Sequence, residues 1–233
     1  MKKMQSLALA MMCLATSCAS QYTVTGTSSL QQLEGKMLYL KVFKDNDMCS
    51  IDSARVVHGR FDFRGAMDSV MMASLYMDDQ SIMPVVLEEG VVSLKLAEVL
   101  QSATGTPLND TLQNFVTRKT QLDARLEELS HKESRMVMDG MDHEEVLRIL
   151  GREAAEINEE NDRLITRFIS RNYNNVLGPG IFMILTSNMP YPILNPQIEA
   201  IFTQATPYFL SHPYVKEFKR IAEENMATLH EDY

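Results

Sequence analysis

The feature that most constrains the fold is a change in hydrophobic period close to Pro107. Between Tyr22 and about Leu96, apolar residues alternate with polar ones in short runs, as Leu38 and Leu40 do. Such alternation is typical of half-buried β-strands, whereas apolar residues three or four positions apart are typical of amphipathic helices. Because the second spacing replaces the first after Pro107, the sequence predicts a β-rich part followed by an α-helical part.

The β-rich part is expected to consist of short strands joined by tight turns. Each alternating set places its apolar members on one face of a strand. The clearest sets are Leu38, Leu40 and Val42; Phe61 and Phe63; and Val92, Leu94 and Leu96. Plausible hairpin turns lie at Asp45-Asn46-Asp47, His58-Gly59 and Glu88-Glu89-Gly90. Roughly seven strands predict an antiparallel β-sandwich or a barrel-like sheet.

The first helix is expected to begin at Thr106-Pro107, with Thr106 as the N-cap and Pro107 in the first turn. Its apolar stripe comprises Leu108, Leu112, Phe115, Leu122, Leu126 and Leu129. A second helix is expected from Asp142, because Asp142 and Glu145 have the spacing of a capping box. Its stripe comprises Leu147, Leu150, Ala154, Ile157, Asn161, Leu164 and Phe168. Two such stripes joined around Asp139-Gly140 predict a long antiparallel helical hairpin.

Two further helices are expected near the carboxyl end. Asn195-Pro196 and His212-Pro213 mark their starts, since each pairs a capping residue with a proline in the first turn. The fold class that follows is α+β. We expect a signal segment at residues 1–17, a β-rich domain at 18–104 and an α-helical region at 105–233.

The amino terminus has the layout of an export signal. Lys2 and Lys3 precede an apolar run from Leu7 to Leu14, which is too short to span a bilayer. Ala15-Thr16-Ser17-Cys18 then resembles the cleavage box of bacterial lipoproteins, so Cys18 is the expected lipidation site. The alternative is an ordinary cut near Ala19, which would release a soluble periplasmic protein. The absence of Asp after Cys18 favours the outer membrane, by resemblance to better-known lipoproteins.

Charge and cysteine content exclude some functions. Loss of Lys2 and Lys3 with the signal lowers Lys+Arg from 22 to 20 against 31 Asp+Glu, so the net charge moves from -9 to -11. So acidic a chain is a poor nucleic-acid binder, because phosphate contacts need clustered cations. With Cys13 removed and Cys18 lipidated, Cys49 has no partner for an intrachain disulfide. Its thiol is either buried and inert or a redox group that reacts with another molecule.

Catalytic and cofactor patterns are weak. We find no convincing Gly-x-Ser-x-Gly, Cys with a partner His, or Ser-x-x-Lys, so no catalytic residue and no cofactor are predicted. The one tempting group is Met136, Met138, Met141 and His143, because thioethers and an imidazole suit Cu(I) or Ag(I). The opposing interpretation is that these methionines have no metal-binding role. The chain has 17 Met residues, and methionine commonly fills gaps in cores.

Four segments carry a resemblance to a known family: Ile51-Asp52-Ser53-Ala54, Gly59 to Gly65, Val86 to Gly90, and Thr104 to Asn109. They resemble the amino-terminal domain of unknown function of Gram-negative lipoproteins, which often precedes a thioredoxin-like thiol-disulfide oxidoreductase domain. In those relatives a helical region similar to residues 163–226 links the two domains. The chain ends at Tyr233 without a Cys-x-x-Cys, so the resemblance assigns redox activity to no residue here.

These observations favour a non-catalytic, periplasm-facing lipoprotein that serves as an interaction or scaffold module of the cell envelope. The expected partners are a membrane, through the lipid on Cys18, and an envelope protein; no pattern specifies the oligomeric state. Two alternatives stay open. The first is an accessory to thiol-disulfide or oxidative-stress chemistry that acts with a separate thioredoxin-like protein through Cys49. The second is a Cu(I)- or Ag(I)-handling protein.

Overall fold

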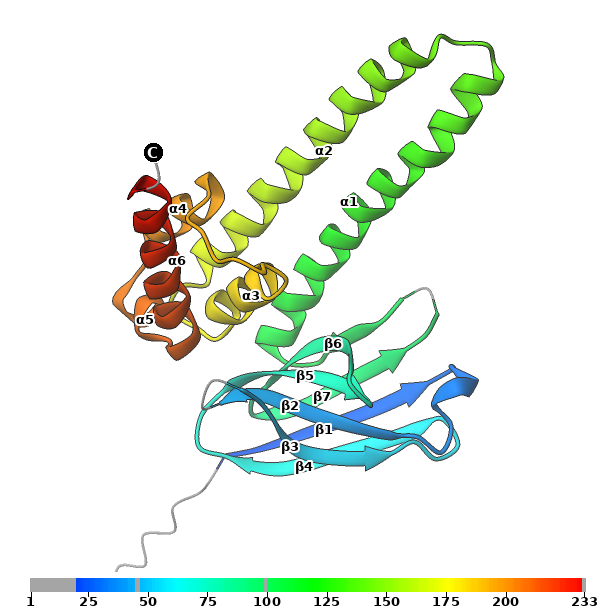
Figure 1. Cartoon of the computed structure of the whole chain (residues 1–233). Helices are drawn as coiled ribbons and strands as arrows, with labels where there is room; N and C mark the ends of the chain where they lie inside the picture. The colour runs from blue at the N-terminus through cyan, green and yellow to red at the C-terminus, as the bar shows by residue number, and fades with distance from the viewer. Residues whose placement is uncertain (1–19, 45–46, 99, 232–233) are drawn as a thin grey trace, which may run out of the picture.

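The chain folds into a β-sandwich followed by a bundle of helices (Figure 1). The computed structural model describes residues 20–44, 47–98 and 100–231. Within these ranges, eight strands precede six α-helices. The predicted α+β class, with the long helical hairpin after the sandwich, is confirmed.

The strands form two sheets of four. They are β1 (Ser20–Ser28), β2 (Met37–Lys44), β3 (Asp47–Arg55), β4 (Arg60–Met67), β5 (Met71–Met77), β6 (Gln80–Leu87), β7 (Gly90–Leu96) and β8 (Ser102–Thr104), with a 3-10 turn at Gln31–Leu33. One sheet has the order β4-β1-β7-β8 and the other β3-β2-β5-β6. All neighbouring strands are antiparallel except β1 and β7, which run parallel from Tyr22 opposite Gly90.

The turns differ in part from the prediction. Lys44 pairs with Asp47, so β2 and β3 form the expected hairpin, although residues 45–46 lie outside the described ranges. His58 and Gly59 have φ values of 50° and 68° and close a tight turn whose N–H groups donate to the carboxylate of Glu34. The hairpin predicted at Glu88-Glu89-Gly90 is wrong. β6 and β7 belong to different sheets, so this segment crosses between them.

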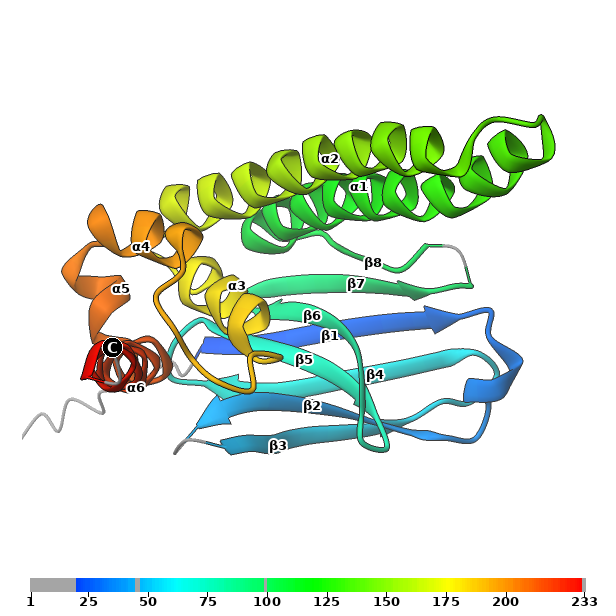
Figure 2. The same cartoon turned by 45° about the horizontal axis from the view of Figure 1, so that its top comes forward.

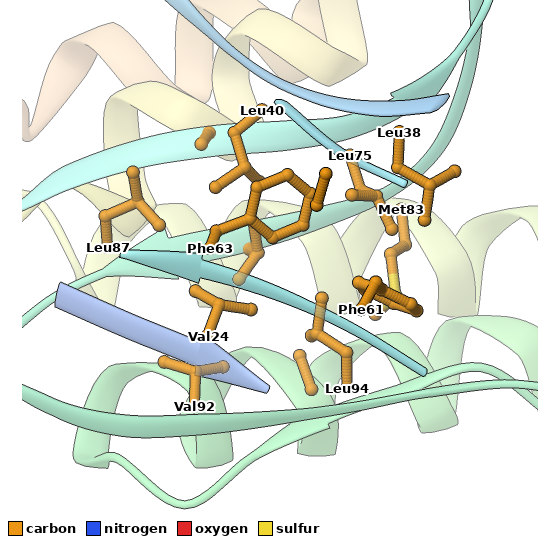
Figure 3. Packing of buried hydrophobic residues seen from close by; sticks show 14 of the residues in the cluster. Val24, Leu38, Leu40, Phe61, Phe63, Leu75, Met83, Leu87, Val92 and Leu94 are labelled. Carbon is orange, nitrogen blue, oxygen red and sulfur yellow. The ribbon is translucent and has the colours of Figure 1, made fainter. Parts of the chain in front are cut away.

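The inner faces of the two sheets enclose one apolar core (Figure 3). Val24 and Phe63 come from one sheet, and Leu40 and Leu75 from the other; each is at most 1 % exposed. These positions alternate with more exposed ones along their strands, which is the period-two pattern of the sequence. Burial of this face is the main force that holds the sandwich together.

The helices are α1 (Pro107–Met138), α2 (His143–Arg171), α3 (Leu177–Thr186), α4 (Pro196–Thr203), α5 (Pro207–Ser211) and α6 (Pro213–Glu231). The antiparallel pair α1 and α2 forms the hairpin, and the four shorter helices pack beside its base (Figure 2). The sequence predicted two helices near the carboxyl end. It missed α3 and α5. For α5 a signal was present, because Thr206-Pro207 repeats the same capping pattern and Thr206 Oγ1 accepts from the Phe209 N–H.

The hairpin follows the predicted stripes with a shift in α2. Leu112, Phe115, Leu122 and Leu129 of α1 are buried, as predicted, whereas Leu126 is exposed. In α2, Leu147 is 52 % exposed and its neighbour Val146 is fully buried, so the stripe assigned from Leu147 was wrong at its start. Asp142 caps α2 as predicted, because its carboxylate accepts from the N–H groups of Glu144 and Glu145.

A polar junction fixes α1 on the sandwich. Asn109 is fully buried, and its amide accepts from the Val86 N–H at 2.9 Å and donates to the Val86 carbonyl at 2.8 Å. Thr106 occupies the N-cap position but makes no side-chain cap hydrogen bond; its hydroxyl oxygen accepts from Asn109 instead. Thr106 is therefore the N-cap residue and Pro107 lies in the first turn, as predicted, but the side-chain cap acceptor is Glu88.

Candidate interaction site on the helical hairpin

The predicted lipidation site, Cys18, lies outside the described residues. Cys49 lies on β3, an edge strand of its sheet, opposite Val42. It is half-buried and free, and its thiol donates to the Lys44 carbonyl at 3.7 Å. The Cys49 thiol is thus neither fully buried, as the inert interpretation expects, nor fully exposed to solvent. A redox role for Cys49 stays a prediction.

The predicted thioether group lies at the tip of the hairpin. Met136 is half-buried against the cluster formed by Leu129, Val146 and neighbours, whereas Met138 is 86 % exposed. Side chains two positions apart on a helix diverge by about 200°. Met141 and His143, beyond the turn, are both exposed. Binding of a soft metal ion by these four residues stays a prediction, and it would require Met136 and Met138 to turn toward each other.

The tip presents an exposed apolar surface. Four side chains compose it, and we call them the apolar tip: Val137, Met138, Met141 and Leu147, which are 47 %, 86 %, 40 % and 52 % exposed. Singly exposed apolar residues are ordinary, but apolar side chains gathered at one end of an element commonly mark a contact surface. The apolar tip is therefore a candidate interaction site.

Local hydrogen bonds give the apolar tip a defined shape. The Asp139 N–H donates to the Arg135 carbonyl, and the Met141 N–H donates to the Met136 carbonyl. Gly140 has a φ of 83°, the left-handed conformation that ends many helices. Below the turn, Arg148 donates two hydrogen bonds to Glu145, and this contact lowers the pKa of the Glu145 carboxyl. The turn therefore holds the exposed side chains on a structured support.

A second surface lies lower on the hairpin, between α1 and α2. A groove of about 820 Å³ is lined by side chains from residues 111–125 of α1, from residues 160–171 of α2 and from Asn172, which follows α2. We call it the arginine groove, because its sides carry Arg118, Arg125, Arg163, Arg167 and Arg171. Its apolar lining consists of Phe115, Leu122, Leu164 and Phe168. Five cations in one groove stand out in a chain with a net charge of -9.

The arginine groove was not predicted from the sequence, although a signal was present. Arg118 and Arg125 are seven residues apart, and Arg163, Arg167 and Arg171 follow at intervals of four, so each set shares one helix face. Charge on an amphipathic helix is usually taken as its solvated face. Only the packing of α1 against α2 shows that the two basic faces line the same groove.

Two negative findings apply to the described part of the chain. In it, no three His, Cys, Asp or Glu side chains are grouped so as to hold a metal ion. None of its helices combines the length and the hydropathy needed to cross a lipid bilayer.

Comparison with known proteins gives one match. No curated protein matches the chain, and no solved structure matches it. The matching segment covers the sandwich and the first turns of α1, which includes the junction around Asn109. Residues 22–112 match the family model described as Domain of unknown function (DUF4369), so the amino-terminal half of the described chain is similar to that domain.

Proposed function

We propose that this protein is a non-catalytic interaction module of the cell envelope, anchored in the outer membrane by a lipid on Cys18 and facing the periplasm. In this proposal the hairpin binds an envelope protein through the apolar tip. The observation that carries the proposal is that four apolar side chains near the turn between α1 and α2 are exposed, at the end of a long projecting element.

Leaving the apolar tip in water costs free energy. Exposed apolar area is unfavourable at roughly 25 cal/mol per Å², so a partner that covers the apolar tip gains free energy from the contact. Met138 contributes most to this gain, because it is the most exposed of the four. Methionine side chains also adapt to partners of varied shape.

The arrangement of the chain supports the same proposal. β1 begins at one end of the sandwich, and the tip of the hairpin lies toward the opposite side in both views (Figures 1 and 2). α1 has 32 residues, which corresponds to about 48 Å of helix. An anchor that precedes β1 would therefore leave the apolar tip directed away from the anchoring membrane, where it is open to a protein partner.

The test is site-specific crosslinking in intact cells. In one variant a photoreactive amino acid replaces Met138. In a control variant the same amino acid replaces Val57, which is 50 % exposed on the sandwich. We expect a discrete protein adduct from position 138 and none from position 57. The adduct should disappear when Leu147→Lys is added, since a charge in the apolar tip opposes burial.

Three outcomes would contradict the proposal: no adduct from position 138, the same adducts from both positions, or adducts with lipid alone. Crosslinks to lipid alone would mean that the apolar tip enters a membrane and does not bind a protein.

The anchor is tested separately. An alkynyl fatty acid supplied to growing cells should label the wild-type protein, and Cys18→Ala should abolish the label and release the protein from washed membranes. An unmodified amino-terminal peptide in mass spectrometry of the wild-type protein would contradict the anchor and leave the proposal for the apolar tip standing.

A further inference from the structure

We propose that the arginine groove is a binding site for a phosphate monoester that carries an apolar body. This site is distinct from the apolar tip, and its ligand is a small molecule, so the inference stands whether or not the tip binds a protein. It is carried by the cations that lack a salt-bridge partner in the described part of the chain, by their spacing and by the apolar lining beside them.

Three of the five arginines lack a salt-bridge partner among the residues that the structure describes. Arg125 pairs with Glu160 at 2.7 Å, and Arg163 pairs with Glu159 at 2.8 Å. Within the described ranges, Arg118, Arg167 and Arg171 form no salt bridge. The base of the arginine groove therefore holds an uncompensated positive charge in an acidic protein, and such a charge attracts an anion.

The unpaired arginines lie close together along the hairpin. Phe115 and Phe168 stack with their ring centroids 4.2 Å apart, so these two residues lie at about the same height along the hairpin axis. Arg118 is three residues from Phe115 on α1. On α2, Arg167 and Arg171 are one and three residues from Phe168. At 1.5 Å per residue, in antiparallel helices, all three fall within about 9 Å along the axis.

The number of donors favours phosphate over a single carboxylate. Each guanidinium offers paired N–H groups that match the oxygens of an anion in a bidentate contact. A carboxylate has two oxygens, whereas a phosphate monoester has three terminal oxygens and a charge of about -1.5 to -2. A phosphate monoester therefore suits three arginines better than a carboxylate does. Asn114 and Thr111 add polar groups to the lining of the groove.

The lining and the volume favour a ligand larger than free phosphate. Phe115, Leu122, Leu164 and Phe168 contribute the apolar strip of the groove lining, beside the arginines. The groove volume of about 820 Å³ falls in the range of small-molecule sites, which is roughly 300–1,000 Å³. An apolar body attached to the phosphate would cover this strip and exclude water from the arginine contacts.

The test uses three soluble probes, each below its micelle concentration, and isothermal titration of the folded protein. Inorganic phosphate carries the head alone, dodecyl maltoside carries an uncharged head on the tail, and dodecyl phosphate combines the charged head and the tail. We expect dodecyl phosphate to bind at least about tenfold more tightly than inorganic phosphate, since several methylene groups leave water. Dodecyl maltoside should bind more weakly than dodecyl phosphate.

Variants locate the binding. The double variant R118Q/R167Q should weaken dodecyl phosphate binding by about tenfold or more, because hydrogen bonds to charged groups are lost. The control is R152Q, which removes an exposed arginine of α2 that does not line the groove and should leave binding unchanged. Circular dichroism and urea unfolding of each variant verify that it is folded.

A further arm identifies the source of the ligand. Vesicles of phosphatidylcholine that contain phosphatidic acid present the same phosphate in a bilayer. Capture of the protein by these vesicles assigns the ligand to a lipid surface, whereas binding of soluble dodecyl phosphate alone assigns it to a free phosphate ester; both support the site. Equal binding of dodecyl maltoside, equal loss in R152Q, or no binding of dodecyl phosphate would overturn it.

Discussion

The carboxylate of Glu88 accepts a hydrogen bond of 2.9 Å from the backbone N–H of Leu108 and so caps α1 from a residue in the connection after β6. The same Oε1 atom accepts from the Asn109 N–H at 3.2 Å. Glu88 is only 7 % exposed, and its negative charge lies at the helix N-terminus, where the helix dipole is favourable to it. The sandwich thus supplies the cap of the hairpin.

Removal of this cap should destabilise the whole protein. Glu88→Ala leaves two N–H groups at the start of α1 without their acceptor, so we expect the free energy of unfolding to fall by about 1–3 kcal/mol. Glu88→Gln keeps one oxygen acceptor and should cost less. Urea denaturation measures both. Glu89→Ala is the control, because Glu89 is exposed; a loss as large as that of Glu88→Ala would contradict the capping role.

Asn109 should matter even more at the same junction. Asn109→Ala leaves the N–H and the carbonyl of Val86 unpaired in a buried place, and we expect a loss of about 3 kcal/mol. Hydrogen exchange gives a local readout, since the Val86 amide should lose protection in the variant. Asn114→Ala, which changes an exposed residue on the same helix, should alter neither quantity. A protected Val86 amide in Asn109→Ala would show that another group holds it.

Two glycines should respond to alanine with opposite signs. A Cβ atom at Gly26 would lie 2.1 Å from the ring of Phe61, which packs across β1 and β4, so Gly26→Ala should destabilise by about 1–3 kcal/mol. Gly151 lies within α2 with nothing within 4 Å of its added Cβ, so Gly151→Ala should stabilise by about 0.5–1 kcal/mol. Thermal unfolding compares them, and the same sign for both would refute the packing argument.

Features encoded by neighbouring residues were predictable from the sequence, and features made by distant residues were not. Asp142 and Asn195 were identified as N-caps because each acts on N–H groups two or three residues away. Glu88 was assigned to a hairpin turn, because its contacts lie 20 residues further on and exist only after β6 meets α1. The arginine groove escaped prediction for the same reason: it requires the relative rotation of α1 and α2, which helical periodicity does not specify.

Alkaline pH should weaken the sandwich through Tyr22. This side chain is 4 % exposed, and its hydroxyl donates to Asp52 at 3.1 Å. Burial first, and the negative Asp52 second, raise the pKa of Tyr22 from 10.0 to about 12. Between these values the folded protein keeps a proton that the unfolded chain releases, so the free energy of unfolding falls as pH rises from 10 to 12.

Variants isolate the contribution of Tyr22 to this pH dependence. Tyr22→Phe removes the ionisable hydroxyl, and the decline between pH 10 and 12 should become shallower by at most about 3 kcal/mol across the window. Asp52→Asn removes the negative neighbour but leaves the burial, so it should reduce the decline in part. Guanidinium unfolding at each pH measures the effect. An unchanged slope in Tyr22→Phe would assign the decline to other groups.

The start of α2 offers a test that separates stability from binding at adjacent positions. Val146 is fully buried against the hairpin, so Val146→Ala should lower the free energy of unfolding by about 1–3 kcal/mol through the cavity it leaves. Leu147 is 52 % exposed, so Leu147→Ala should change it by less than about 0.5 kcal/mol. If the apolar tip contacts a partner, Leu147→Ala should nevertheless weaken the crosslink formed from position 138. A larger stability loss in Leu147→Ala than in Val146→Ala would restore the stripe first assigned from the sequence and remove Leu147 from the apolar tip.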